Sequence, residues 1–450
     1  MLKKQCLIGL FLLSITASTF AGQGMFIRIR SYVPNIGVTV GKPECIDGYQ
    51  NIGINKTAYI EGSCLFEKKR LNLNIMNNNQ IIKQYAIELS MMNDGSSITS
   101  EGVYFIGDKV IAATLYPHQG VSGTQDWLAI SIAPQEDAWM KNMGQQIGSK
   151  SLSSISMPGT HDTGTYGISK PEIAPDLDKT VQNLLRNDPM KEQHLQYAKD
   201  WAVTENLDML NQLKVGIRYF DLRLCKTSQD ELKTCHGLYA ASMKSIIDDV
   251  VQFIHVPNHE KEIIILDFAP LNINSGDIAK LSQWLVNAFG SKIASPTQFN
   301  VNSLINTFWQ QQRQIIVMLN NDTEASRYPD LFWPGSRSYG LWANTENSDE
   351  LITKMINSLN GRDHTKLFNF SLVLTPQPQT VILGLLGGSI NSLIKMTGGY
   401  KFKINDWLDQ PQNKEQVRTH GNIISEDFSN GIDLTELTKE LNSSTRLTAS

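Results

Sequence analysis

Three short stretches of the chain bring together the residue types that acid–base catalysis uses. Ser154–Gly164 reads S-I-S-M-P-G-T-H-D-T-G and contains His161 and Asp162. Further along, Val215–Arg223 reads V-G-I-R-Y-F-D-L-R, and His236 follows in a His-Gly pair. Imidazole exchanges protons near neutral pH, and guanidinium binds anionic oxygens. These residues therefore predict general acid–base chemistry on an anionic group.

Strands alternating with helices must position these residues, because the pattern changes to this alternation after about residue 140. Helices are expected over Thr204–Leu213 and Val381–Met396, among others. Eight strands interleaved with helices predict a parallel α/β barrel, in which chemistry sits at the C-terminal strand ends. The predicted strands are Ser151–Met157, Gly216–Cys225, Lys233–Leu238, Glu262–Phe268, Gln314–Leu319, Tyr339–Ala343, Phe370–Thr375 and Asn422–Phe428.

Ionisable residues gather at the ends of these predicted strands. The first, second, third, fourth and last strands carry His161 with Asp162, Arg223, His236, Asp267 and Asp427. In a parallel barrel these ends meet at one face, so we expect the side chains to share one site.

Residues 22–140 follow a different pattern. Short, often alternating stretches such as Leu71–Met76 and Lys109–Tyr116 are separated by Asn, Gly and Asp turns. We therefore expect an N-terminal all-β, sandwich-like domain, followed by the barrel domain over residues 145–450. This β domain could bind glycan, lipid or protein, or only cover the barrel.

Residues 1–21 have the layout of a secretory signal peptide. Lys3 and Lys4 precede the apolar run Leu7–Ile15, and small residues lead to a cleavage site after Ala21. We therefore predict a secreted protein, extracellular or periplasmic. A retained membrane anchor is the alternative, although the apolar run is short for a membrane span.

The cysteines fit export. Four remain after removal of the signal, and the simplest pairing is Cys45–Cys64 with Cys225–Cys235. Four buried thiols are the alternative. No cysteine or histidine spacing suggests a structural zinc site.

The composition describes an ordinary globular protein and excludes an electrostatic nucleic-acid binder. The 450 residues are 41% hydrophobic and 19% charged, with a formal net charge of −4. A chain of this length suits two domains. No basic run or RNA-binding motif is present, so nucleic acid is not an expected partner.

Five motifs together resemble the X domain of phosphatidylinositol-specific phospholipase C. They occur in the family's order and spacing, and the similarity covers roughly residues 145–445. The motifs are M-P-G-T-H-D-T-G (157–164), G-I-R-Y-F-D-L-R (216–223), C-H-G (235–237), N-H-E-K-E-I-I-I-L-D-F (258–268) and I-I-S-E-D-F (423–428).

This resemblance implies a distorted TIM (β/α)8 barrel and an activity. Phosphatidylinositol, or a glycosyl-phosphatidylinositol anchor, would be cleaved to diacylglycerol and inositol 1,2-cyclic phosphate. The protein would act peripherally on phospholipid at a membrane surface.

The resemblance also implies a role for each catalytic residue. His161 matches the base that takes a proton from the inositol 2-hydroxyl, and His236 matches the acid that protonates the leaving oxygen. Arg223 would stabilise the charge on phosphorus. Asp162 would assist His236, and Asp427 would hold the tautomer of His161.

The same motifs indicate catalysis without a metal or other cofactor. The calcium-dependent branch of the family has Asn after its first histidine and an acidic pair in the second motif. Here those positions hold Asp162 and Asp221-Leu222-Arg223. A guanidinium can replace the charge of Ca²⁺ but not its coordination, so we predict the metal-independent, bacterial-type chemistry.

Headgroup specificity stays open. Some bacterial members place a lysine after the fourth strand to contact inositol, but Ala269 occupies that position here. Asp221, which shares a strand face with Arg223, and Asp267 are candidate substrate contacts, and Asp267 could equally be a buried partner. Trp342 could stack on a sugar or pack the rim.

Two further sequence features allow a structural interpretation. Arg218 lies five positions before Arg223 and so on the opposite face of the strand, where an exterior salt bridge is expected. The run V-I-L-G-L-L-G-G-S-I (381–390) is either an ordinary barrel helix or an apolar lip that touches a bilayer.

Two rival functions remain open. One is a phosphodiesterase acting on another phospholipid or sphingolipid headgroup. The other is a non-catalytic lipid- or glycan-binding protein.

Overall fold

A computed structural model gives the structure of residues 24–64, 68–89, 96–117, 125–186 and 189–443. The predicted signal peptide, residues 1–21, lies outside the described residues. None of the helices in the described ranges is both long and apolar enough to cross a membrane.

The N-terminal part consists of two sheets that share one apolar core. In the strand β5 every second side chain is buried, including Leu71, Leu73 and Ile75, as the alternating sequence predicts. These side chains meet Met25 and Ile130 of the other sheet in a single cluster. The first sheet has the order β3 (Ile46–Asp47), β4 (Lys56–Gly62), β1 (Gly24–Ser31), β10 (Asp126–Pro134), β9 (Lys109–Tyr116), β8 (Gly102–Ile106). The second has the order β2 (Ile36–Val40), β5 (Arg70–Asn77), β6 (Gln80–Glu88), β7 (Ser97–Ile98).

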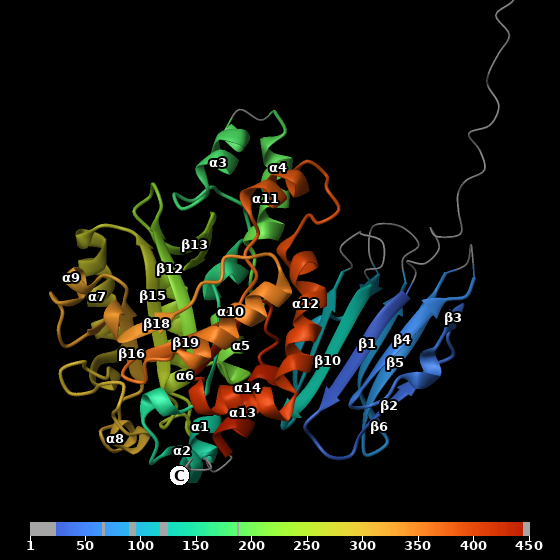
Figure 1. Cartoon of the computed structure of the whole chain (residues 1–450), viewed down its shortest axis with the longest axis horizontal. Helices are drawn as coiled ribbons and strands as arrows, with labels where there is room; N and C mark the ends of the chain where they lie inside the picture. Colours follow the sequence, from blue (N-terminus) through green and yellow to red (C-terminus); the bar gives the residue numbers. More distant parts are fainter. Residues whose placement is uncertain (1–23, 65–67, 90–95, 118–124, 187–188, 444–450) are drawn as a thin grey trace, which may run out of the picture.

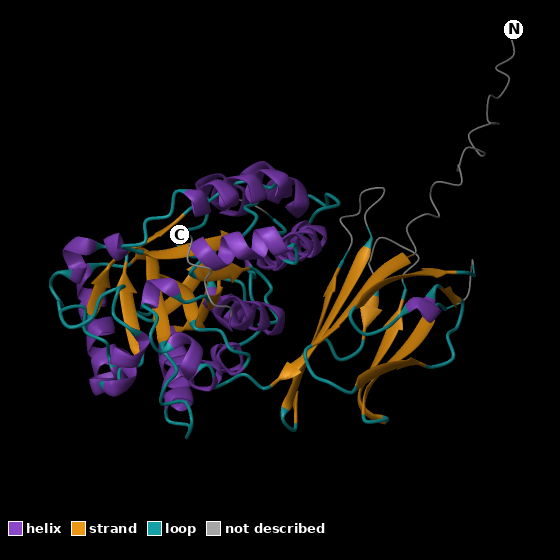
Figure 2. Ribbon diagram, turned by 60° about the horizontal axis from the view of Figure 1, so that its bottom comes forward, coloured by secondary structure: helices purple, strands orange, loops and turns teal. Residues whose placement is uncertain are grey.

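The rest of the chain builds a curled parallel sheet wrapped by helices (Figures 1 and 2). Its first strand pairs with its last, so the sheet curls back on itself in a TIM-barrel-like arrangement. This confirms the predicted α/β class. The order in space is β17 (Phe332–Pro334), β16 (Ile315–Leu319), β15 (Ile264–Asn272), β12 (Tyr219–Lys226), β11 (Met157–Thr160), β20 (Ile423–Glu426), β19 (Leu367–Leu372), β18 (Ser338–Gly340).

The expected closed barrel is not formed by hydrogen bonds all the way round. Among the described strands, β17 and β18 are not paired with each other. Only three residues, Gly335–Arg337, connect them. Parallel neighbours need a crossover of about a dozen residues or more, so these two short strands cannot pair. This short connection carries the chain from β17, which pairs with β16, to β18, which pairs with β19.

Two of the strand predictions need correction. The predicted strand Lys233–Leu238 is not part of the parallel sheet. Its residues fall in an antiparallel hairpin, β13 (Leu232–His236) and β14 (Leu238–Ser242), that extends from β12. The first strand is also displaced, because Leu152–Ser154 forms a 3-10 turn and β11 begins only at Met157.

The helices cover the outside of this sheet, and two predictions about them were wrong. The predicted helix Thr204–Leu213 is shorter, α5 (Met209–Lys214), capped by the Asp208 side chain, and α4 (Lys191–Ala202) occupies the polar stretch before it. The predicted helix Val381–Met396 is two helices, α11 (Pro378–Leu385) and α12 (Leu393–Leu408), with Gly387 at φ 91° between them. The other helices are α1 (Trp139–Asn142), α2 (Gly144–Ile147), α3 (Lys179–Arg186), α6 (Met243–Ile254), α7 (Ser275–Phe289), α8 (Ile305–Gln310), α9 (Asp322–Ala325), α10 (Ser348–Asn360), α13 (Pro411–His420) and α14 (Ile432–Ser443).

Side chains along the parallel strands alternate between two apolar clusters. Phe220 and Leu266 belong to the cluster that also contains side chains of α6, α7 and α10, whereas Tyr219, Ile265 and Ile423 belong to the other cluster. Since the side-chain period is two, the positions that follow on this second face are Asp221, Asp267 and Ser425. The interior of the curled sheet thus changes from apolar to polar toward the C-terminal strand ends.

The N-terminal sheets dock on the curled sheet through α12, which lies beside β10 in Figure 1. Trp127 of β10 stacks on Phe402 of α12, with ring centroids 3.9 Å apart. Arg28 pairs with Asp406 at 2.9 Å.

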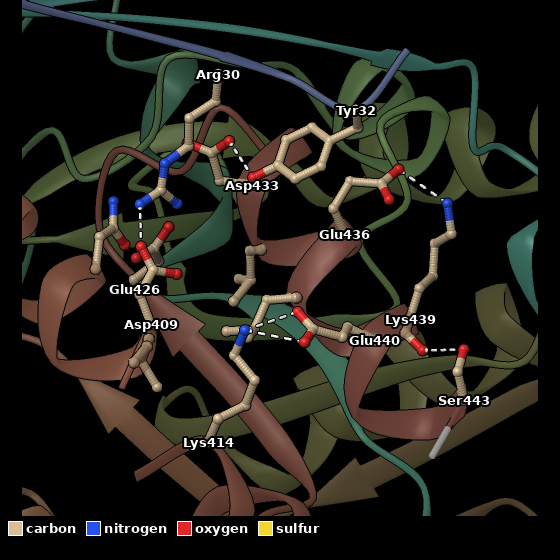
Figure 3. A pocket seen from close by; sticks show the side chains of 14 residues that line it. Arg30, Tyr32, Asp409, Lys414, Glu426, Asp433, Glu436, Lys439, Glu440 and Ser443 are labelled. Atoms are coloured by element: carbon tan, nitrogen blue, oxygen red, sulfur yellow. Dashed lines mark hydrogen bonds and ion pairs between the residues drawn. The ribbon is translucent and has the colours of Figure 1, made fainter. Parts of the chain in front are cut away.

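A second contact region surrounds a cavity of about 340 Å³ (Figure 3). Arg30 pairs with Asp409 at 2.6 Å, and Tyr32 donates a hydrogen bond to Asp433 at 2.9 Å. Arg30 and Tyr32 belong to the N-terminal part and Asp409 and Asp433 to the rest of the chain, so these contacts join the two parts.

Candidate active site

Most of the predicted site residues come from different strands, or from the turns that follow them, and meet at one place. β11 ends at Thr160, and His161 follows directly. Thr160 is paired with Glu426 of β20, so Asp427 leaves the sheet beside His161. Gly159 allows this layer to pack, because a Cβ there would lie 2.8 Å from the Tyr219 ring.

His161 is held at both ring nitrogens. Its Nδ1 lies 2.8 Å from Asp427 Oδ1, and its Nε2 lies 2.9 Å from Nη2 of Arg223. A guanidinium can only donate, so Nε2 accepts and the proton of the neutral ring sits on Nδ1, donated to Asp427. This is the tautomer that a general base at Nε2 requires.

The surroundings of His161 favour a second proton. Burial alone would lower the pKa of His161, but the carboxylates of Asp162 and Asp427 raise it to about 9, against the opposing charge of Arg223. The protonated Nε2 faces Asp162 Oδ2 at 3.2 Å. His161 therefore has a partner for Nε2 in either protonation state.

Asp162 lies between the two predicted catalytic histidines. It is 3% exposed, and its Oδ2 is 3.2 Å from Nε2 of His161 and 3.4 Å from Nε2 of His236. Its Oδ1 is 2.6 Å from Nε of Arg223. Burial would raise the pKa of Asp162, but Arg223 and both histidines lower it. Within the described residues neither carboxylate oxygen receives a well-directed hydrogen bond, so these contacts are ion pairs.

His236 lies on the hairpin strand β13 and presents Nε2 to the site. Its Nδ1 donates to the carbonyl of Ala202 at 2.8 Å, which leaves Nε2 to gain or release a proton. The rings of His161 and His236 are 6.1 Å apart between centroids. Ala202 gave no signal in the sequence, because its contribution is a main-chain oxygen.

A polar layer continues from the histidines across the sheet interior. Asp221 Oδ2 is 3.9 Å from Nε2 of His161 and accepts from the backbone N–H of Asp162. Asp267 accepts from the Tyr219 hydroxyl at 2.8 Å, and Asn369 donates to that hydroxyl. Burial raises the pKa of Asp267 to about 7.

Sequence reasoning missed Tyr219 and Asn369. The period of two from Asp221 could have found Tyr219, since both lie on the same face of β12. Of the two roles expected for Asp267, the structure shows the buried partner, because its carboxylate accepts the hydrogen bond of the Tyr219 hydroxyl.

Trp342 is the predicted site residue that the structure does not bring to the others. Its side chain is 68% exposed, and its indole N–H donates to Thr375 Oγ1. In the part of the chain that the structure describes, no contact joins it to the histidines.

The residues present do not fit a metal ion well. Ligand atoms of His161, Asp162 and Asp221 all lie within 4.8 Å of one another, so a cation could be imagined among them. Arg223, however, contacts both His161 and Asp162 at hydrogen-bonding distances. Its guanidinium therefore already places positive charge where the ion would sit.

An apolar pocket of about 330 Å³ adjoins the site on the side of His236. Leu177, Val181, Trp201, Leu238 and Val381 line it, together with Arg223 and His236. Helices α3, α4 and α11 supply much of its wall.

The predicted disulfides Cys45–Cys64 and Cys225–Cys235 are both present. The second joins β12 to β13 and so links the strand that carries Arg223 to the strand that carries His236.

The buried pair of Arg218 and Glu262 corrects another expectation. Arg218 is fully buried, and all its N–H groups donate, to Glu262 and to three main-chain carbonyls. The predicted salt bridge exists, but it is internal because helix α1 and the segment before it cover this end of β12.

Comparison with known proteins gives the family. No model of a known protein family matches the chain. The chain is 30% identical to PI-PLC X domain-containing protein 2 of Mus musculus, over 68% of this chain and 87% of that protein. It is 31% identical to the Homo sapiens protein of the same name, over 57% and 83%. Among solved structures, phosphatidylinositol-specific phospholipase C from Listeria monocytogenes aligns with a TM-score of 0.46 and 17% identity, over 68% of this chain and 98% of that one. This chain belongs to the PI-PLC X domain-containing protein family.

Proposed function

We propose that this protein is a secreted phosphodiesterase that cleaves phosphatidylinositol, or a glycosyl-phosphatidylinositol anchor, without a metal ion. The products are diacylglycerol and inositol 1,2-cyclic phosphate. The observation that carries the proposal is the arrangement of two histidines on either side of Asp162, with Arg223 in contact with both His161 and Asp162.

The first half of the reaction uses His161 and Arg223. Neutral His161 takes the proton from the inositol 2-hydroxyl at Nε2 while the hydroxyl oxygen attacks phosphorus. Asp427 accepts the Nδ1–H bond and stabilises the imidazolium that forms. Arg223 donates to the phosphoryl oxygens as negative charge grows on them.

The second half uses His236. As the bond from phosphorus to the glycerol oxygen breaks, protonated His236 gives its Nε2 proton to that oxygen. Asp162 Oδ2 lies 3.4 Å from Nε2 of His236, the atom that carries this proton. The cyclic phosphate keeps the former 2-hydroxyl oxygen bonded to phosphorus, so atoms and protons balance.

The apolar pocket beside His236 supports a lipid as the leaving group. A proton donor must lie next to the departing oxygen, and here that donor borders walls formed by Leu177, Val181 and Trp201. An apolar alcohol such as diacylglycerol fits these walls better than a hydrophilic one. The polar layer around Asp221 and Asp267 is then left for the headgroup.

The sequence of the N-terminus also supports a proposal about location. We propose export with cleavage after Ala21, which two disulfides support because they persist in oxidising compartments. Mass spectrometry of the protein from the exported fraction tests this. A mature chain that begins at Gly22 is expected, and an uncleaved chain in the cytosol would reject it.

The test of the activity is incubation of the mature protein with phosphatidylinositol micelles in EDTA, followed by phosphorus NMR. A cyclic phosphate signal that is lost with His161→Ala and with His236→Ala is expected. Activity only after Ca²⁺ is added would overturn the role of Arg223. Release of a different headgroup from another phospholipid or sphingolipid would replace the substrate, and no cleavage of any of them would favour a binding protein.

A further inference from the structure

The main chain around Asp427 is held by side chains from two other parts of the molecule. Lys401 of α12 donates to the carbonyls of Asp427 and Phe428 at 2.7 and 2.8 Å. Its third contact is an ion pair with Glu426 at 3.1 Å. Tyr116, from β9 of the N-terminal sheets, donates its hydroxyl to the same Phe428 carbonyl at 3.3 Å.

This stretch of chain needs such support. Phe428 has φ 49°, a left-handed conformation that is uncommon for a bulky residue and persists when its surroundings fix it. The side chain of Lys401 is 12% exposed, and its three ammonium protons have three partners. The carbonyls that follow β20 are therefore fixed from the α12 side.

Thr204 ties the same stretch to His161 from the opposite side. The backbone N–H of Phe428 donates to the Thr204 carbonyl at 2.6 Å. The Thr204 hydroxyl donates to the carbonyl of His161 at 2.8 Å. The main chains that carry Asp427 and His161 are thus fixed relative to each other.

The N-terminal sheets set the position of α12 and so of Lys401. The Tyr116 ring packs edge-on against Phe402, with centroids 5.7 Å apart, and Trp127 stacks on the same ring. Gly398 permits this approach, because a Cβ there would lie 2.9 Å from Cβ of Tyr116. Lys401 is adjacent to Phe402 in sequence, so this docking also places its side chain.

We propose that Tyr116 and Lys401 are positioning residues that align Asp427 with Nδ1 of His161, and that the N-terminal sheets are therefore part of the catalytic apparatus. They act through the main chain of Asp427 and Phe428 and do not touch the substrate. The catalytic consequence rests on the proposed function, whereas the alignment itself does not.

Positioning and simple charge effects predict opposite results for Lys401→Met. Removal of a positive charge near Asp427 would, by Coulomb's law alone, stabilise the His161 imidazolium and raise its pKa. Loss of alignment with Asp427 would lower that pKa. The other charged or titratable groups facing His161 are Asp162, Asp221, Arg223 and His236, and those facing Lys401 are Glu426, Glu205 and Tyr116.

The experiment titrates His161 by imidazole ¹H–¹⁵N NMR in the whole mature protein. Variants are Lys401→Met, Tyr116→Phe and Asp427→Asn, the last to show the full effect of losing the carboxylate. Tyr116→Phe deletes one oxygen and keeps the ring packing, so it remains informative if Lys401→Met does not fold. Tyr32→Phe is the matched control, because it deletes an equivalent hydroxyl of the N-terminal sheets that bonds Asp433 instead.

We expect Lys401→Met and Tyr116→Phe to lower the pKa of His161, in the direction of Asp427→Asn but by less. The value for kcat/KM on phosphatidylinositol should fall on the order of 10-fold for Lys401→Met, as for a small misplacement of a catalytic group. Tyr32→Phe should leave the pKa of His161 unchanged and kcat/KM within about twofold of the wild type. An unchanged pKa in Tyr116→Phe and Lys401→Met, or a raised one in Lys401→Met, would overturn the proposal.

The NMR result separates this inference from the proposed function. If the wild type cleaves no phosphodiester but the pKa of His161 falls as expected, the positioning role stands and the activity is wrong. If cleavage occurs and the pKa does not move, the activity stands and the positioning role is wrong.

Discussion

Replacement of Asp427 by Asn should shift the pH profile of kcat/KM to lower pH, because Asp427 is one of the groups that raise the pKa of His161. Burial would lower the pKa of His161, but Asp162 and Asp427 raise it from 6.5 to about 9. That difference corresponds to about 3 kcal/mol in favour of the imidazolium. Since the proposed base must be neutral, kcat/KM should rise with pH toward 9, and at pH 7 only ~1% of the free enzyme is competent.

Asp427→Asn removes one of the two carboxylates that favour the imidazolium. The acidic limb of the kcat/KM profile should therefore move to lower pH by about 1–3 pH units. The plateau should fall at the same time, because an amide can donate to Nδ1 and select the wrong tautomer. A matching change in a serine protease triad costs about 10⁴-fold.

Arg223→Gln is the counterpart, because the guanidinium opposes protonation of His161. Its removal should move the limb to higher pH, and loss of a donor to the phosphoryl group should cost about 10²–10³-fold in rate. The assay is kcat/KM between pH 5 and 10 on a short-chain, monomeric substrate at constant ionic strength, with circular dichroism at each pH as the folding control. Limbs that move in the same direction in both variants, or in neither, would refute this account of His161.

Three further predictions concern the supports of the site. Glu262→Ala should lower the free energy of unfolding in urea by about 3–5 kcal/mol, because it leaves the fully buried charge of Arg218 without its partner; a change below 1 kcal/mol would show that Arg218 finds another partner. The double change Cys225→Ala, Cys235→Ala should lower the free energy of unfolding by about 3 kcal/mol, because a short loop of the unfolded chain is no longer closed. It should also lower kcat, because β13 then holds His236 less firmly. An unchanged kcat would contradict the role of the disulfide in holding His236. Asp267→Asn should raise the melting temperature more at pH 8 than at pH 5. The unfolded chain releases this proton from about pH 3.8 and the folded protein only near pH 7, so the cost to the folded state grows between these values and is complete at pH 8. Equal shifts at both pH values would contradict this.

The site was predictable to the extent that its residues lie in motifs at strand ends. His161, Asp162, Arg223 and Asp427 are adjacent in space because parallel strands bring their C-terminal ends to one face. His236 reaches the same place by a different route, on the antiparallel hairpin strand β13 that extends from β12. Whether each plays its proposed role is for the variants to decide. Their proximity followed from the sequence once the strands were recognised.

The residues that support these five could not be predicted in the same way. Ala202 and Thr204 act largely through main-chain atoms or a single hydroxyl, and any residue type supplies a carbonyl. Lys401 lies in α12 but beyond Met396, where the predicted helix Val381–Met396 ended. Its contact with Asp427 depends on how α12 packs against β9 and β10, which no local pattern specifies.

Errors in the fold arose where short segments had no strong period. β17 has three residues, too few for an alternating pattern, and was missed. Lys233–Leu238, most of the first half of the hairpin β13–β14, was predicted to be a barrel strand because its composition is similar to that of the other predicted strands. The pairing of Cys225 with Cys235 could have corrected this, since a bridge across so short a loop favours an antiparallel hairpin over a parallel crossover.

Arg218 and Arg223 show what periodicity can and cannot establish. The odd spacing correctly placed the two guanidinium groups on different sides of one chain segment, and only Arg223 reaches His161. The exterior position predicted for Arg218 was wrong, because a face directed away from the sheet interior is not necessarily directed toward water. Here Glu262 and the chain around Asp137 fill that space, so a buried cation is tolerated with every donor satisfied. Arg218 therefore stabilises one end of β12, whereas Arg223, in the proposed mechanism, binds phosphate near the other end. The difference is set by the carboxylate that each guanidinium faces, Glu262 for Arg218 and Asp162 for Arg223.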